Sequence, residues 1–264
     1  MNNLAAASDL PNGAEPRKQS LLTHLLELRA RLLWSFVAMV AGTIICFFFA
    51  QEIYGFLVRP LAAAMSPYDS KRLIYTGLSE AFLTYMKVAF FAGCFLSFPV
   101  LLSQIWIFVA PGLHKNERRA FLPFLIATPV LFFAGGALVY YVIMPLAWQF
   151  FLSFETLGGS TVLPIRLEAR VSEYLDLVMV LIFAFGVCFE LPVVLTLLGR
   201  VGIVRADMLA RGRRYAIVAA FAAGAVLTPP DVLSQFCLAL PIIGLYELSI
   251  FCVRFIEKNG ARAA

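Results

Sequence analysis

Charged residues are scarce in this sequence, and the motifs of common enzyme classes are missing. Only 14% of the 264 residues are Asp, Glu, Lys or Arg. Neither histidine, His24 or His114, belongs to an HExxH pattern, so we expect no metal site. No GxSxG or GxxxxGK(S/T) pattern occurs, which argues against a serine hydrolase and an NTPase. We therefore expect no enzyme activity and no cofactor.

Cysteine pairs and a basic stripe are also missing. None of the five cysteines stands in a CxxC pattern, and all lie in apolar runs, which is typical of packing residues. The net charge of +5 is spread between apolar segments and forms no stripe that could line a nucleic-acid groove. This distribution argues against nucleic acid as a partner.

Apolar residues are abundant instead: 61% of the chain is hydrophobic, including 25 phenylalanines. This composition predicts an all-α polytopic membrane protein. We expect six spans, with a fifth run of only about 21 Å as a helix, short of the roughly 30 Å hydrocarbon core. We expect the fifth and sixth runs to form a short hairpin. Local thinning of the bilayer, or packing behind longer helices, would accommodate its short length. The predicted spans are about 32–50, 82–110, 120–151, 175–199, 215–228 and 232–252.

The flanking segments set the orientation. Residues 1–19 are polar and lack an apolar signal-peptide core, so we expect a disordered tail before a transmembrane domain at 20–255. An amphipathic lead-in from Ser20 should lie at the interface and feed the first span. Of the 21 Lys and Arg, 15 fall on the side of the two termini and five on the other. Both ends are therefore predicted to be cytoplasmic, with 256–264 as a cytoplasmic tail.

One carboxylate interrupts the fourth span. Glu190 would cost about 2.5 to 3.5 kcal/mol at the bilayer centre, so it should face protein or water. Pro192 has no N–H for the Cys188 carbonyl, and Gly186 leaves a notch on the same face, which together predict a polar groove beside Glu190. Two interpretations stay open: a protonated carboxyl hydrogen-bonded inside the bundle, or a polar site that meets water or a partner.

Two further acids lie on the predicted cytoplasmic side. Glu27 stands four residues before Arg31, so it either forms a helical ion pair or offers a binding site. Glu117 is the only acid of the basic loop at 111–119 and either balances its neighbours or binds a ligand. Both alternatives stay open for each acid.

Four motifs are recognisable. They are HLLELRARLL (24–33), PGLHKNERR (111–119), FGVCFELPV (185–193) and LTPPDVLSQ (227–235). In this order they resemble the TatC family, the multi-spanning subunit of the twin-arginine protein translocase, over about residues 21–254. The motif at 111–119 departs from the family at Asn116, where a histidine is expected.

The resemblance implies a core receptor subunit in the bacterial inner membrane. It would bind the twin-arginine signal peptides of folded cargo at the cytoplasmic face and nucleate a complex driven by the proton-motive force. The implied partners are the single-span subunits TatA and TatB and further copies of the chain. Glu27, Glu117 and Arg29 match the signal-peptide site.

Other positions of the family carry over to the membrane domain. Glu190 and Gln235 match polar positions of a concave membrane face contacted by partner helices. Further functional candidates are Pro60 in the first outer loop, Phe108 at the inner end of the second span and Asp231 in the LTPPDVLSQ motif.

Simple chemistry supports the signal-peptide site. Two adjacent arginines present two planar forks that carboxylates match best, and Glu27 and Glu117 are rare acids on a basic surface. The alternative function is a proton-coupled secondary transporter or channel that uses Glu190 as a relay. The sequence has no second acid at matching depth and no visible inverted repeat, and both absences argue against that alternative.

Overall fold

The structure is a computed structural model that describes residues 17–65, 72–109, 118–155, 167–227 and 232–263. These residues form helices joined by short turns, and a single isolated bridge pairs Ile74 with Arg170. The all-α prediction is thus confirmed. The helices are α1 (Arg17–Phe48), α2 (Ala50–Ala64), α3 (Glu80–Val109), α4 (Arg118–Leu138), the π-helix η2 (Val139–Ile143), α5 (Met144–Leu152), α6 (Val171–Cys188), α7 (Leu191–Arg200), α8 (Ala206–Leu227) and α9 (Val232–Ala263).

Within the described residues, five helical segments are long and apolar enough to cross a membrane. The chain is therefore a multi-pass membrane protein. α8 is not among the five, since its first half holds the basic sequence ARGRR. The five segments are Leu26–Phe48, Glu80–Ile105, Pro123–Leu152, Val171–Arg200 and Gln235–Lys258.

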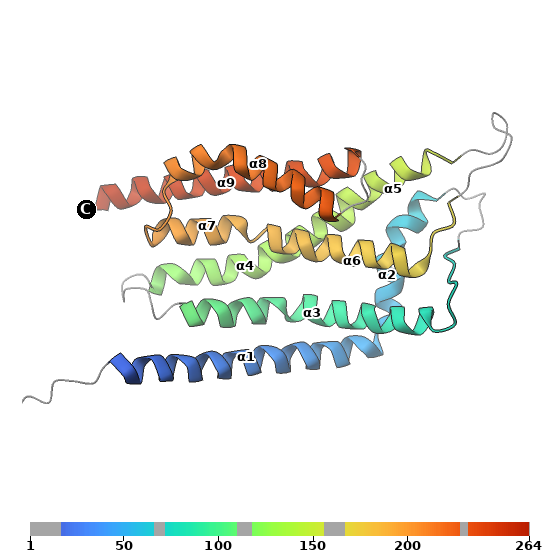
Figure 1. The fold of residues 1–264 in the computed structure, drawn as a ribbon, viewed down its shortest axis with the longest axis horizontal. Coiled ribbons are helices and arrows are strands. Elements are labelled where there is room, and N and C mark those ends of the chain that lie inside the picture. The colour runs from blue at the N-terminus through green and yellow to red at the C-terminus, as the bar shows by residue number, and fades with distance from the viewer. Residues whose placement is uncertain (1–16, 66–71, 110–117, 156–166, 228–231, 264) are drawn as a thin grey trace, which may run out of the picture.

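The long helices lie side by side, and α2 crosses them at one end (Figure 1). α1 forms one edge of the bundle and packs on α3, where Gly93 lets the two backbones approach: a Cβ at Gly93 would lie 2.5 Å from Thr43 Cα. The Ser97 hydroxyl of α3 donates to the Ala38 carbonyl of α1 at 3.0 Å. The large side chains on the other face of α1 are exposed, as expected for a helix that faces lipid.

α8 and α9 form an antiparallel hairpin that polar contacts hold at two levels. Near one end, the Tyr246 hydroxyl donates to the Leu209 carbonyl at 2.9 Å and Arg213 pairs with Glu247 at 2.7 Å. Nearer the other end, the Gln235 amide donates across the hairpin. At its connecting end the hairpin stops short of α3 and α6 (Figure 1), as the short fifth apolar run predicts.

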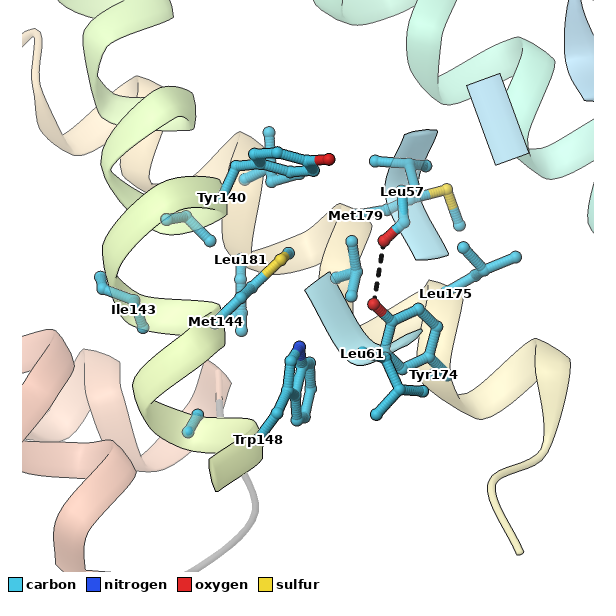
Figure 2. Close-up of a cluster of buried hydrophobic side chains, with 14 of the residues drawn as sticks. Leu57, Leu61, Tyr140, Ile143, Met144, Trp148, Tyr174, Leu175, Met179 and Leu181 are labelled. Carbon is cyan, nitrogen blue, oxygen red and sulfur yellow. Dashed lines mark hydrogen bonds between the residues drawn. The ribbon is translucent and has the colours of Figure 1, made fainter. Parts of the chain in front are cut away.

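A buried cluster fixes α2 against α6 and the η2 segment (Figure 2). Pro60 has no N–H, so the Phe56 carbonyl one turn earlier lacks its helical donor. The Tyr140 hydroxyl supplies a donor at 2.8 Å. The Tyr174 hydroxyl donates to the next carbonyl, that of Leu57, at 2.9 Å. Two tyrosines thus donate to consecutive carbonyls in the turn before Pro60.

Two helices run further than the sequence suggests. The amphipathic lead-in does not form a separate interfacial helix, because residues 17–48 are one continuous helix, α1. No proline or glycine interrupts the junction between lead-in and span. α9 likewise continues through residues 256–263, which the sequence places in a tail beyond the last span.

Candidate functional site

Glu190 stands at the break between α6 and α7. Its N–H donates to the Val187 carbonyl at 3.0 Å, a shorter loop than a regular helix has, and its carbonyl accepts from the Val194 N–H at 2.9 Å. Pro192 lies at the start of α7, where a missing N–H is tolerated. The residue is only 5% exposed. Its side chain therefore faces protein rather than lipid, as the sequence predicts.

The carboxyl of Glu190 is poorly satisfied. The hydroxyl of Thr128, a buried residue of α4, interacts with it. This contact is loose, because neither carboxyl oxygen has a hydrogen bond of good geometry to any described residue. A buried polar group in this condition calls for an explanation such as a bound proton, a water or a partner group.

The notch predicted at Gly186 is filled by a side chain of a neighbouring helix. A Cβ at Gly186 would lie 2.6 Å from the Phe132 ring of α4, so that ring occupies the notch. Phe132 also stacks on Phe98 with ring centroids 4.1 Å apart. Because Thr128 and Phe132 are one turn apart, the same face of α4 covers both Glu190 and Gly186.

Gln235 and Glu190 lie on neighbouring elements but have separate contacts. The Gln235 amide donates to the Phe221 carbonyl at 3.0 Å, inside the hairpin. One turn further along α9, Ala239 belongs to a cluster that packs against Cys188 at the α6–α7 break. Among the described residues, no hydrogen bond joins Gln235 to Glu190, so the concave polar face stays a prediction.

Glu27 and Arg29 lie at the end of the bundle where α1 begins. Glu27 is partly exposed and accepts a hydrogen bond from the Arg31 guanidinium, so the predicted helical ion pair is confirmed. Arg29 is exposed. The pair is partly buried, since the Arg31 side chain is 18% exposed and the Glu27 side chain 40% exposed.

The structure describes only some of the other candidate residues. α3 ends at Val109 and α4 begins at Arg118, both at the same end of the bundle as the start of α1 (Figure 1). Glu117 and Asp231 lie outside the described residues. Phe108 stands in the last turn of α3 and its side chain is not described, whereas Pro60 is buried in α2.

Sequence reasoning missed Thr128 as the neighbour of Glu190. The available signal was weak: a polar residue in the third apolar run, one turn before Phe132 and two turns before Gly135, on the face that meets α6. Among the described residues, no three His, Cys, Asp or Glu side chains gather closely enough to hold a metal ion.

The sequence is similar to proteins of one known family. The family of Sec-independent protein translocase proteins (TatC) matches residues 23–241. The TatC protein of Magnetococcus marinus is 50% identical over 93% of this chain and 88% of its own length. The Escherichia coli TatC protein is 38% identical over 92% of this chain and 91% of its own length.

A solved structure agrees with these relatives. A crystal structure described as the twin-arginine translocase receptor TatC superposes with a TM-score of 0.76 at 36% identity, and covers 89% of this chain and 99% of its own. The chain therefore belongs to the TatC family of Sec-independent protein translocase proteins, which are translocase subunits and not enzymes.

Proposed function

We propose that this chain is the core receptor subunit of a twin-arginine translocase. It binds the signal peptides of folded precursors at the cytoplasmic face and nucleates a complex, containing TatA, TatB and further copies of itself, that the proton-motive force drives. The observation that carries this proposal is the likeness to the solved twin-arginine receptor over 89% of the chain.

The proposed topology is six spans in the bacterial inner membrane with both termini in the cytoplasm. The start of α1 and the end of α9 lie at the same end of the bundle (Figure 1), which an even number of crossings requires. The 15 basic residues at the termini and at 111–119 and 200–214 favour the cytoplasm for that end. α8 supplies the sixth crossing with its apolar second half.

The proposed signal-peptide site uses Glu27 together with Glu117. Glu27 already accepts from a guanidinium group, that of Arg31, and this contact supports the proposal that an arginine of the peptide binds there. The existing pair joins two side chains one turn apart on the same helix, and the Glu27 side chain, 40% exposed, is still accessible to a ligand. A bidentate guanidinium from a bound peptide can therefore share or displace it.

Photocrosslinking of a signal peptide to the full chain in membranes tests this site. We expect Glu27→Ala and Glu117→Ala, singly or together, to reduce crosslinking severalfold, and a twin-lysine peptide to crosslink weakly to the unaltered chain. Asp207→Ala, at an exposed acid in the first turn of α8 at the same end of the bundle, is the matched control. Equal crosslinking in all variants would remove the acids from the site.

A second proposed site is Glu190 with Gln235, which receives a polar side chain from a partner's transmembrane helix. The poorly satisfied carboxyl supports it, because a partner's hydroxyl or amide would supply the missing donor. We expect Glu190→Ala to reduce crosslinking to the partner helix, whereas Val194→Ala, one turn away and exposed, leaves it unchanged. Intact crosslinking and export in Glu190→Ala would make the carboxyl a tolerated core group.

The structure gives the proton-coupled transporter little support. Glu190 is the only buried Asp, Glu, Lys, Arg or His among the described residues of the bundle. The nearest acid along its own span, Asp176, is 14 residues away, roughly 21 Å along a helix, and pairs with Lys87. A proton relay from Glu190 therefore lacks a second proton-accepting group nearby. Liposomes that contain this chain alone should show no proton-coupled uptake of a small solute.

A further inference from the structure

An apolar cavity lies on the side of the bundle where α2 crosses α3 and the α4–η2 segment. Its volume is about 330 Å³, at the lower end of the range of ligand pockets. α6 contributes its inner wall through Ile182. Exposed side chains at its rim, such as Leu96 and Tyr141, place its opening on the face that meets the membrane. Its lining includes Phe91, Phe95, Phe133, Ala137 and Tyr140.

The shape and lining of the cavity suit a hydrocarbon chain. The lining residues of the α4–η2 segment run from Phe133 to Tyr141, a rise of about 12 Å along the helix axis. A cavity with so apolar a lining does not hold water. Because its opening faces the hydrocarbon region of the bilayer, the groups available to fill it are acyl chains.

A cation stands at the α2 end of the cavity. The Phe56 and Tyr140 rings stack there, 4.3 Å apart and nearly parallel, and close that end. Arg59 lies one turn beyond Phe56, is exposed, and is close enough to the Tyr140 hydroxyl to interact with it electrostatically. Arg59 makes no ion pair with any described residue, and Glu52, two turns back on α2, does not reach it.

We propose that this cavity binds an acyl chain of an anionic phospholipid whose phosphate is held by Arg59. The guanidinium fork matches a phosphate, and the chain attached to that phosphate runs down the cavity between α3 and α4. The site lies in the leaflet at the α2 end of the bundle, opposite the proposed signal-peptide site. The bound lipid fills space that packing leaves open between α2 and the spans.

Native mass spectrometry of the full chain in detergent tests the charge requirement. The chain is titrated with phosphatidylglycerol and with phosphatidylcholine of the same acyl chains. We expect tighter binding of phosphatidylglycerol, and an Arg59→Gln affinity about tenfold lower that approaches the phosphatidylcholine value. Arg72→Gln, on the same side but already paired with Glu168, is the control and should change little. Equal binding of both lipids by the unaltered chain would overturn the proposal.

Filling the cavity tests the acyl-chain site. Ala137 is exposed and lines the cavity, whereas Ala134, one turn earlier on α4, is exposed and does not. Ala137→Phe should reduce binding of both lipids severalfold, and Ala134→Phe should not. If both variants bind the lipids as well as the unaltered chain does, the proposal is contradicted. It is also contradicted if Ala137→Phe keeps its lipid binding but loses a copurifying single-span partner. Signal-peptide crosslinking should persist in all four variants, so failure here leaves the receptor function untouched.

Discussion

Pro60 acts through a carbonyl rather than through its own ring. Because Pro60 has no N–H, the Phe56 carbonyl accepts a hydrogen bond from the Tyr140 hydroxyl instead. The Leu57 carbonyl accepts one from the Tyr174 hydroxyl (Figure 2). Tyr140→Phe and Tyr174→Phe should each lower the free energy of unfolding by about 1 to 3 kcal/mol, because a buried carbonyl loses its donor. Thermal unfolding in detergent measures this loss.

A neighbouring tyrosine provides the control for that prediction. Tyr141→Phe, at an exposed position of η2, should leave the melting temperature unchanged. In a Pro60→Ala background the Phe56 carbonyl regains a backbone donor, so Tyr140→Phe should cost less there than in the parent chain. Additive effects of the two substitutions would contradict this role of Pro60.

Glu190 should show opposite effects on stability and on assembly. Its carboxyl is desolvated and only loosely contacted by Thr128, so Glu190→Leu should leave the melting temperature unchanged or raise it. The same variant should lose crosslinking to the partner helix. A large drop in melting temperature would instead show that the carboxyl stabilises the isolated chain.

Single residues were predictable where local sequence decides their surroundings. Glu190 stands out because a charge in an apolar run must be sheltered, and the helix break follows from Pro192. The neighbours of Glu190 were not predictable, since Thr128 and Phe132 reach α6 only through the packing of α4 on it. For this reason the sequence did not reveal that Phe132 fills the notch at Gly186.

At the scale of helices, close approach of α1 to α3 depends on Gly93. A methyl group there would meet the backbone of Thr43, which cannot move without displacing α1. Gly93→Ala should therefore destabilise the chain by about 1 to 3 kcal/mol in thermal unfolding. Gly244→Ala, in α9 with open space around it, should be neutral or stabilising. Equal melting temperatures for the two variants would contradict this packing.

Helix positions followed from hydropathy far better than helix junctions did. Five of the six apolar runs correspond to α1, α3, the α4–α5 segment, α6–α7 and α9, and the short fifth run to the second half of α8. The position of α2 depends on contacts with tyrosines from η2 and α6. Those contacts join residues more than 80 positions apart, which no sequence period reveals.

For the whole molecule, the number of crossings has a direct parity test. Single cysteines are introduced as Leu26→Cys or Lys258→Cys into a chain that lacks the five native cysteines. Each should react with a membrane-impermeant maleimide only after the membrane is opened. Ser79→Cys, just before α3, should react in intact cells. Labelling of Lys258→Cys and Ser79→Cys from the same side would favour an odd number of spans over the proposed six.

The proposed topology depends on charge and motif order, because both are encoded along the chain. The proposed meeting of Glu27 with Glu117 depends on how the segments beside α1 and α4 come together at one end of the bundle. The sequence alone predicts only that both acids lie on the same side of the membrane. Glu27 is described beside Arg31, whereas Glu117 lies outside the described residues.

The central claim, that Glu27 binds a guanidinium of the signal peptide, is tested most directly by a double-mutant cycle. Binding of peptides with twin arginine or twin lysine is measured for the unaltered chain and for Glu27→Gln. We predict a coupling between the two changes of about 0.5 to 3 kcal/mol, with the lysine peptide losing little further affinity in Glu27→Gln. Independent, additive losses would contradict the claim.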